Sequence, residues 1–536
     1  MPNQRKTPGV YVSEINSCGN SIVPVATAVP AFIGYTHNTS YNGEDLRNKP
    51  RRVTSLSDYY TIFGNKPPVT QFDLEKTTTD AADFTYGEDG ESYMVKANGP
   101  QYRMHSALQF FYNNGGEECY VVCVGDYKDP IKAADLKAAV DLLEKEVRPT
   151  LLLIPEAVEL YDDSQSALKD RYKDAYSLQS HMINHCGSIG NRMAILDIPR
   201  GYWEPEKNPS QSIDAFRENV NPSQSAYYSF AAAYYPWLHT NLYSEADFSY
   251  ENLSGNAMKT LDTLLKIDAS QVPEQSKGAV LLMISQLTSL AAAEGADAPP
   301  TEDPKSSNEE QLKIKADRQK NAHNNLQSIS KAYKLVLRTI QKKVNTMPPS
   351  AAMAGIFTSV DMNQGVWIAP ANVAINSVTG PAVHITSEMQ EDLNVPLSGK
   401  AINAIRTFPG QGVLVWGART MDGNSQDWRY VNVRRTTIFL EQSIKSAIRV
   451  YVYEPNTANT WATIKSEIAN FLTDVWKQGA LMGSSPSDAY SVAVGLGSTM
   501  TAEDILNGIL RVSVKVALTH PAEFIEISFE EKMIEG

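Results

Sequence analysis

A series of short, continuously apolar runs restricts the fold of this chain more than any other feature of its sequence. Runs of this kind are typical of strands buried on both faces of a parallel sheet. Segments with apolar residues at helical spacing separate them, most clearly at 133–147. The alternation predicts a layered α/β domain. The predicted core strands are 29–36, 119–124, 150–155, 193–199, 231–238 and 412–419.

The predicted α/β domain extends over 29–425 and contains two stretches of different texture. Residues 37–100 are polar and irregular, and 240–346 are mostly helix-like. A Pro-rich acidic stretch inside the second region is typical of a flexible linker. We interpret 37–100 and 240–346 as insertions in the domain. The helices predicted up to residue 346 are 103–113, 133–147, 164–186, 256–268, 277–293 and 309–345.

A second compact unit is predicted over 426–519. It contains helix-like segments and strand-like segments in turn, which is typical of an α+β domain. Its longest helix, 460–478, has apolar residues on one face and charged residues on the rest. The fold class is therefore α/β plus α+β. The other elements predicted here are a helix at 436–448, a strand at 449–454, a helix that starts near Thr501, and a strand at 510–518.

Both ends of the chain contain strand-like arms, an N-terminal linker arm over 1–28 and a C-terminal arm over 520–536. In the second arm apolar and polar residues alternate, as in a half-buried strand. Two interpretations remain open. The arms exchange between neighbouring copies by strand addition, or they close a sheet within their own subunit. The arm residues assigned to these strands are Val10, Tyr11, Val12, Ile15, Phe524, Ile525, Ile527 and Phe529.

Composition excludes several classes of protein. The formal net charge of −13 argues against wrapping nucleic acid, which needs a basic face. Four cysteines in 536 residues do not form a disulfide framework. The start of the chain lacks the apolar run of a signal peptide, and no apolar run is long enough to insert in a membrane. We expect the chain to be made and folded in the cytosol.

The motif search predicts no catalytic, metal or cofactor site, and hence a protein that is not an enzyme. His181 and His185 have a spacing that suits zinc on a helix, or they are ordinary polar helix surface. Asp197 ends a predicted strand, where α/β enzymes place catalytic carboxylates, but we interpret it as a capping or turn residue. Cys119 and Cys123 are expected to be small apolar groups in the core. Phosphate-binding loops and nucleophile elbows are absent from the sequence.

A set of short motifs, in order along the chain, resembles the contractile tail sheath family. This family includes phage tail sheaths, R-type pyocin sheaths and the sheaths of extracellular contractile injection systems. The resemblance covers about three quarters of the chain, and 37–100 and 240–346 depart from it; we expect these two regions to face outward. The motifs lie at 8–12, 110–116, 119–122, 234–238, 348–355, 365–372, 402–406, 415–420, 430–435, 454–456, 479–481 and 521–524.

The resemblance implies a structural role. Sheath subunits form a helical homo-oligomer of stacked rings around an inner tube protein, and their terminal arms link neighbours. The sheath assembles in an extended, metastable state between a baseplate and a terminal cap, and its contraction drives the tube through a target envelope. The assembly is made in the cytoplasm as part of a phage tail or tail-like particle, which some systems release.

On the same resemblance, Lys465 and Lys477 of the helix 460–478 are candidate tube-facing residues that meet acidic groups of the tube. The alternative is that both lysines are simply solvated. For the whole protein, the rival interpretations are a monomeric α/β enzyme or ligand-binding protein, and a non-contractile structural shell protein.

Overall fold

The computed structural model describes residues 22–67, 70–78, 82–87, 89–202, 211–288 and 308–524. The chain divides into two compact units. One is 27–434, and the other combines 1–26 with 435–536. The chain passes from the first to the second within the long helix α13 (Val431–Ile448). No described helix combines the length and the apolar content needed to cross a lipid bilayer.

A nine-stranded sheet organises the 27–434 unit. Its order is β14-β17-β16-β11-β10-β9-β1-β8-β4, and the neighbours from β16 to β8 pair in parallel. The prediction of continuously buried core strands is confirmed for β1 (Pro30–Thr36), β9 (Leu151–Leu153), β10 (Met193–Asp197) and β11 (Ala231–Tyr235). The strand β8 (Cys119–Asp126) also forms as predicted, but Tyr120, Val124 and Asp126 are half-buried.

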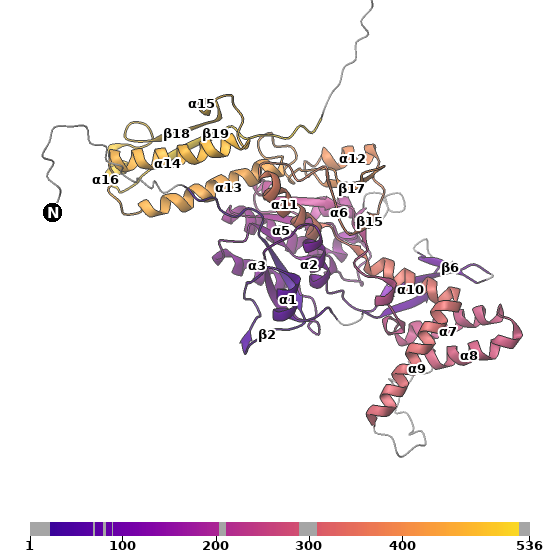
Figure 1. Cartoon of the computed structure of the whole chain (residues 1–536). Coiled ribbons are helices and arrows are strands. Elements are labelled where there is room, and N and C mark those ends of the chain that lie inside the picture. The colour runs from indigo at the N-terminus through magenta and orange to yellow at the C-terminus, as the bar shows by residue number, and fades with distance from the viewer. Residues whose placement is uncertain are drawn as a thin grey trace, which may run out of the picture. The chain divides into compact units, whose positions relative to one another are not determined.

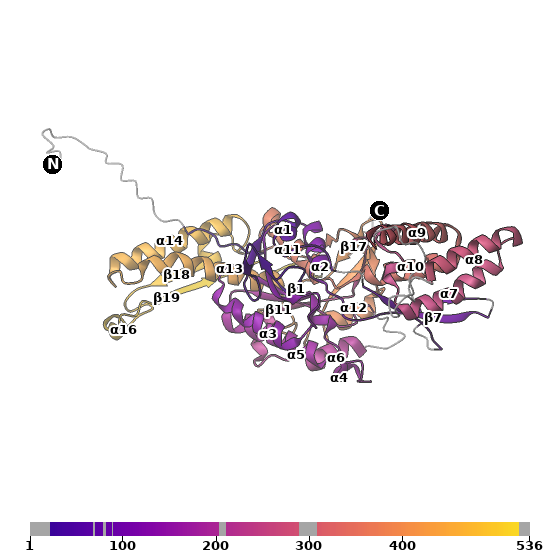
Figure 2. The same ribbon diagram turned by 90° about the horizontal axis from the view of Figure 1, so that it is seen from below.

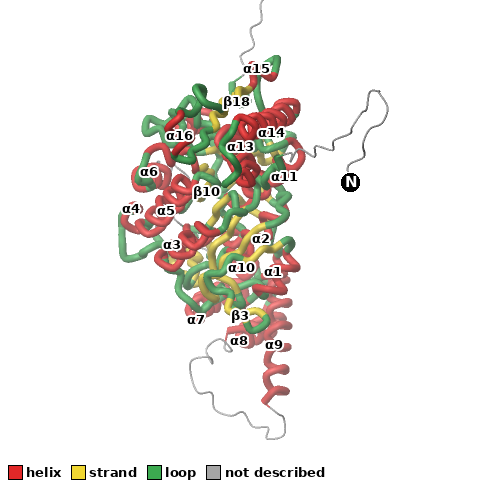
Figure 3. The backbone as a smooth tube through the Cα atoms, turned by 90° about the vertical axis from the view of Figure 1, so that its left-hand side faces the viewer, coloured by secondary structure: helices red, strands yellow, loops and turns green. Residues whose placement is uncertain are grey.

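Alternate residues of these strands enter two hydrophobic cores. Ile33 and Leu152 pack with α3 (Ala133–Leu142) and α5 (Lys173–Ile189). Their chain neighbours Phe32 and Leu153 pack with α2 (Met104–Asn113) and α11 (Ser350–Gln364). Figures 2 and 3 show the strands between these two groups of helices. Because both faces are covered, the strands are apolar without interruption.

The end of the sheet next to β11 differs from the prediction. The strand β16 (Asn403–Phe408) was not predicted, and β17 (Gly412–Val415) runs antiparallel to it. The strand β16 can bury the polar side chain of Asn403 because this side chain makes hydrogen bonds within the core. The antiparallel β14 (Val373–Ala374) and β4 (Arg51–Val53) form the two edges of the sheet.

The prediction that 37–100 is irregular is wrong. The region contains α1 (Leu56–Phe63) and a three-stranded antiparallel sheet. Phe72 and Leu74 of one strand and Tyr93 and Val95 of another are buried at alternate positions, so that a polar composition hides a regular pattern. The strands of this sheet are β5 (Phe72–Lys76), β6 (Phe84–Tyr86) and β7 (Glu91–Ala97). The strands β2 (Ser40–Tyr41) and β3 (Glu44–Asp45) form a separate pair.

Four helices share a third hydrophobic core with this small sheet (Figure 1). The predicted helix 309–345 is in fact two helices, which separate at Ser330. The Ser330 side chain caps the second helix by accepting from Tyr333 N at 3.0 Å, while Asp268 accepts from Ala332 N at 3.0 Å. The four helices are α7 (Gly255–Ser270), α8 (Glu274–Thr288), α9 (Asn308–Ile329) and α10 (Lys331–Val344).

Two other helix boundaries differ from the prediction. The helix predicted at 133–147 ends at Leu142, and a 3-10 turn follows over Leu143–Lys145. Val147 lies beyond this turn and is exposed, and Pro149 disfavours helical geometry in Arg148. The helix predicted at 164–186 begins later, as the short α4 (Leu168–Arg171) followed by α5.

The second unit contains most of α13, the helix α14 (Ala458–Lys477), and a two-stranded antiparallel sheet of β18 (Tyr490–Val494) and β19 (Val512–Val516). The predicted strand at 449–454 is wrong, because η7 (Arg449–Tyr451) continues from α13 as a 3-10 turn. Within the described chain, β18 and β19 pair only with each other. The 449–454 segment therefore has no adjacent strand to join.

Candidate functional site

Asp197 ends β10 and caps α11, a helix that starts more than 150 residues later in the chain. Its carboxylate accepts from Ser350 N at 2.9 Å and from the Ser350 hydroxyl. The side chain is almost fully buried, and burial raises its pKa to about 6. The prediction that Asp197 is a capping residue is confirmed.

Glu156 has the same role at the neighbouring strand, and sequence reasoning missed it. It lies in the 3-10 turn η2 (Pro155–Glu159) just after β9, and Oε1 accepts from Arg103 N at 3.0 Å and from Met104 N at 2.8 Å, where α2 begins. Glu156 is fully buried, and burial raises its pKa to about 7. A carboxylate that directly follows a predicted buried strand was the signal that could have identified it.

Side chains of the protein itself therefore fill the region at the carboxyl ends of the parallel strands. Arg103 forms a buried ion pair with Glu159 at 2.6 Å, and its guanidinium lies 5.0 Å from the centre of the Trp237 ring. Trp237 in turn donates to Ile198 O at 2.8 Å. In open α/β sheets the ligand usually binds at the carboxyl ends of the strands. Here the polar groups at these strand ends fix the starts of α2 and α11 on one face of the sheet.

The two histidines of α5 have different surroundings. His181 Nε2 lies 2.7 Å from Asp141 Oδ1 near the surface. His185 is buried beside Arg192, with 3.5 Å between Nε2 and Nη1, and burial lowers its pKa to about 4. Among the described residues, no group of three or more His, Cys, Asp or Glu side chains is arranged to hold a metal ion.

Cys119 and Cys123 are buried in the core that β8 shares with α2, as predicted. Burial raises the pKa of the Cys119 thiol to about 12, so this thiol stays protonated at neutral pH. A protonated buried thiol is a small apolar group rather than a nucleophile.

Several of the sequence motifs brace the sheet. Asn403 is fully buried, and its amide donates to Ala233 O at 3.1 Å and to Arg419 O at 2.7 Å. Near the start of α13, the Arg434 guanidinium lies 3.7 Å from the Trp428 ring and 4.3 Å from the Phe230 ring. The motifs at 402–406, 415–420 and 430–435 therefore have structural roles in the 27–434 unit.

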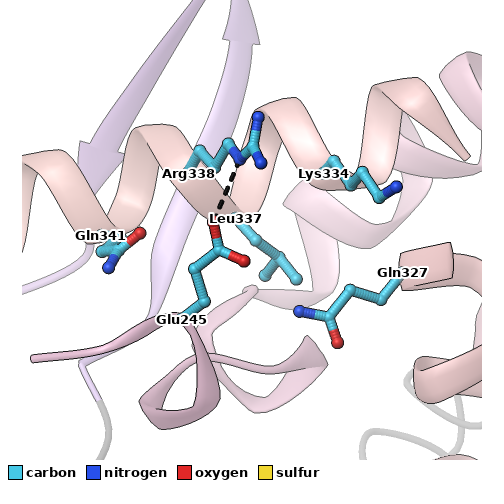
Figure 4. Close-up of a pocket in the computed structure, with 6 residues that line it drawn as sticks. All are labelled: Glu245, Gln327, Lys334, Leu337, Arg338 and Gln341. Carbon is cyan, nitrogen blue, oxygen red and sulfur yellow. Dashed lines mark hydrogen bonds and ion pairs between the residues drawn. The ribbon is translucent and has the colours of Figure 1, made fainter.

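A shallow hollow lies between α10 and a 3-10 turn, η4 (Glu245–Asp247). Figure 4 shows Glu245 and Arg338 pointing toward each other across it. They form an exposed ion pair at 3.2 Å. Apart from these two residues, Gln327, Lys334, Leu337 and Gln341 line the hollow. These residues do not include a nucleophile or a metal-ligand cluster.

The two-stranded sheet of the second unit is the least complete part of the described structure. Val492 pairs with Val514, and these side chains are only half-buried. In the described chain each strand has one edge without a partner strand. Two-stranded sheets are marginally stable on their own, and unpaired edges are templates for a further strand.

The helix α14 covers one face of this sheet. Its predicted apolar face is confirmed, since Ile464, Ile468 and Phe471 are buried. Tyr490 of β18 is hydrogen-bonded to Thr473 of α14 through their hydroxyl groups, at 2.6 Å.

The predicted assembly residues are placed as follows. Lys465 and Lys477 are exposed on α14, and Lys477 lies 3.7 Å from Asp474. Phe524 is 71% exposed. The remaining arm residues, Val10, Tyr11, Val12, Ile15, Ile525, Ile527 and Phe529, lie outside the described residues.

Comparison with known proteins identifies two matching family models. The phage tail sheath protein central domain matches residues 301–421, and the phage tail sheath C-terminal domain matches residues 424–531. The tail sheath protein of Vibrio phage KVP40 is 25% identical over 135 residues, and that of Enterobacteria phage T4 is 24% identical over 126 residues. These alignments cover 25% and 24% of this chain, but only 20% and 19% of the two phage proteins.

Solved structures match over almost the whole chain. A chain of the PVC sheath complex, from an extracellular contractile injection system in its contracted state, is 26% identical with a TM-score of 0.56, and the match covers 99% of both chains. The contracted helical sheath of the anti-feeding prophage is 24% identical with a TM-score of 0.54, over 99% of this chain and 100% of that one. With both family models matched in order along the chain, the protein resembles the contractile tail sheath family over residues 301–531.

Proposed function

We propose that this chain is the structural subunit of a contractile sheath. It polymerises around an inner tube in an extended, metastable state, and it contracts to drive the tube through a target envelope. The observation that carries the proposal is the match to the PVC sheath chain, which extends over 99% of both chains at 26% identity. The chain acts by assembly and movement, not by catalysis.

Neighbouring copies are linked by strand addition at the sheet of β18 and β19. The donors are the N-terminal arm 1–28 and the C-terminal arm 520–536 of adjacent subunits. The apolar side of the donor strands, with Val10, Val12, Ile525, Ile527 and Phe529, is then buried against the second unit of the neighbouring copy. Each added hydrogen bond contributes a net ~0.5–1.5 kcal/mol. Several such bonds per arm, repeated along the polymer, keep the lattice connected while the compact units move.

The proposed sheath role also accounts for the domain boundaries and for the two exposed lysines predicted from the sequence. The body comprises an α/β domain over 29–425, with outward insertions at 37–100 and 240–346, and a C-terminal α+β domain over 426–519. Lys465 and Lys477 face acidic groups of the inner tube protein, and their exposure on α14 supports this.

The partners of the sheath are further copies, the tube, a baseplate and a terminal cap. A chain of the anti-feeding prophage baseplate has the same fold, at 24% identity and a TM-score of 0.56, which supports a baseplate contact. Assembly takes place in the cytoplasm, as part of a phage tail or a tail-like particle.

Electron microscopy of purified material tests the proposal. Wild-type protein assembled with its tube should form long striated cylinders in two states, a longer and a shorter one. A monomer that never forms cylinders would contradict the proposal, and cylinders of a single length would indicate a non-contractile shell.

A matched pair of substitutions tests the arm. Ile527→Asp places a charge on the apolar face of the donor strand, whereas Ser528→Asp places the same charge on its polar face. We expect I527D to remain a folded monomer that does not polymerise, and S528D to form sheath. Equal assembly of both variants would exclude strand addition by this arm.

A further inference from the structure

One helix of this acidic chain has only positively charged side chains. The 14 residues of α10 include five basic and no acidic ones, although the whole chain has 61 acidic and 48 basic residues. Four of the five are exposed and follow one another at intervals of three or four residues, so they share one face of the helix. The fifth, Lys343, is half-buried and already ion-paired. We call the four exposed residues the basic row, and it extends about 16 Å along the helix axis. They are Lys331, Lys334, Arg338 and Lys342.

Most of the basic row has no opposite charge beside it. Arg338 pairs with Glu245, but no carboxylate of the described chain lies within ion-pair distance of the three lysines. Like charges three or four residues apart destabilise a helix, and Lys331 and Lys334 also lie near the positive end of its dipole. A surface that serves only solubility mixes both signs. The row is therefore unfavourable for the free helix, and a bound anion would relieve it.

A hollow with further hydrogen-bonding groups lies beside the basic row. Figure 4 shows Gln341 of α10, Gln327 of α9 and Glu245 around it, together with Lys334. Lys334 is held in place, because its ammonium donates to Ser328 O at 3.1 Å. The site thus offers cations along the helix and, next to them, amide and carboxylate groups that can accept hydrogen bonds.

This combination distinguishes among negatively charged polymers. A DNA or polyphosphate backbone has acceptors but no hydrogen-bond donor, so the Glu245 carboxylate would repel it. The row also contains no aromatic ring on which bases could stack. An anionic membrane fits poorly, because the apolar face of α10 is buried in the third core and cannot insert. A polysaccharide with carboxylate groups supplies both kinds of partner, carboxylates for the lysines and hydroxyl donors for Glu245 and the two glutamines.

We propose that the basic row and the hollow beside it bind a carboxylated polysaccharide, with the polymer lying along the axis of α10. This goes beyond the proposed sheath function, which needs only further copies and the partners of the assembly. Each contact of an exposed lysine is weak, so the affinity comes from several contacts along one polymer. Because the site is exposed, binding weakens as the salt concentration rises.

Two triple variants of the full chain test the site. Both replace three exposed lysines of the 27–434 unit by glutamine, so they change the net charge equally. The row variant is K331Q/K334Q/K342Q. The control variant is K128Q/K132Q/K145Q. Binding to immobilised polygalacturonate is measured at salt concentrations from about 50 to about 200 mM. The row variant should lose about tenfold in affinity and show a shallower salt dependence, whereas the control should bind like wild type.

Competition identifies the chemistry of the ligand. At equal charge concentration, polygalacturonate should displace the chain better than poly-L-glutamate, double-stranded DNA or phosphatidylglycerol vesicles, and neutral dextran should have no effect. Stronger displacement by any of these would overturn the assignment to a polysaccharide. Equal binding of the row and control variants would overturn the site itself.

Assembly separates this site from the proposed function. Both variants should melt at the wild-type temperature and form sheath. A row variant that folds but does not assemble would show that the row is an assembly contact, and would overturn the inference. If the wild-type chain binds polygalacturonate but forms no cylinders, the proposed function fails and the binding site stands.

Discussion

The central sheet of the 27–434 unit and the two-stranded sheet of the second unit are built on opposite plans. The first has helices on both faces, and its core strands β1, β9 and β10 are buried along their whole length. In the second, the strand side chains are half-buried or exposed, and both strands have an edge without a partner in the described chain. The first sheet is covered on both faces within one copy, and we propose that the second is completed by strands of neighbouring copies.

This difference explains how one chain combines rigidity with movement. A sheet buried on both faces transmits force without deforming, because close-packed interiors are hardly compressible. In the proposed sheath, a marginal sheet with open edges would link copies through backbone hydrogen bonds, which tolerate rotation of the attached units. The predictions that follow test the contrast, starting with the largest expected effect.

The largest effect is expected in the central core. Phe32→Ala removes a fully buried ring that lies 5.4 Å from the Phe111 ring. The free energy of unfolding should fall by about 3–5 kcal/mol, as is usual for Phe→Ala in a core. Urea denaturation of the monomer measures it. A loss below about 1 kcal/mol would mean that this core can collapse around the cavity.

A buried cap should have the next largest effect. Asp197→Ala leaves the Ser350 amide and hydroxyl without their partner at the start of α11. We expect a loss of about 2 kcal/mol in the free energy of unfolding. Asp504→Ala removes the carboxylate that accepts from Thr501 N at 2.9 Å, in the capping box of α16 (Ala502–Leu506) at the surface of the second unit. It should cost less, because water can replace the lost hydrogen bonds. A larger loss for Asp504→Ala would reverse the contrast between the two units.

The buried carboxyls also predict a dependence on pH. Burial raises the pKa of Glu156 from its usual 4.5 to about 7 and that of Asp197 from 3.8 to about 6. The folded chain therefore holds these protons more tightly than the unfolded chain. Through these two groups, the free energy of unfolding falls as the pH rises from about 4 to about 7.

Glu156→Gln tests this directly. The amide oxygen can still accept from Arg103 N and Met104 N, but it does not titrate. Relative to wild type, the variant should become more stable as the pH rises from 5 to 7.5, as measured by urea denaturation at each pH. A constant difference between the two proteins would exclude Glu156 as the titrating group.

The smallest effect on the monomer is expected in the two-stranded sheet. Val514→Ala shortens a half-buried side chain on β19. The loss in free energy of unfolding should be about 0.5–1 kcal/mol, much less than for a fully buried residue. The same variant should shorten or destabilise assembled sheath, where added strands bury the position. A loss above about 2 kcal/mol in the monomer would show that this sheet is already complete in a single copy.

The sequence predicted the elements in which burial produces a local run or face of apolar residues. The apolar runs at 150–155 and 193–199 identified β9 and β10, and the apolar face of 460–478 identified the buried side of α14. The sequence did not predict β16, because the polar side chain of Asn403 is hydrogen-bonded to residues that are remote in the sequence. A single sequence does not display such long-range compensation.

The sequence led to a wrong prediction where residues alternate like a strand but no neighbouring strand pairs with them. Residues 449–454 alternate like a strand, yet they continue α13 as a turn and expose Val450 and Val452. The role of Glu156 depends on tertiary arrangement, so no local motif marks it. The exposure of Lys465 and Lys477 agrees with the predicted tube face, and their contact with a tube stays a prediction.

The most direct test of strand sharing is amide hydrogen exchange, measured on the monomer and on assembled sheath. If neighbouring copies add strands, exchange should slow strongly on assembly in β18, in β19 and in residues 525–529, while the buried β10 changes little. Equal exchange rates for β18 and β19 in the two states would contradict the account.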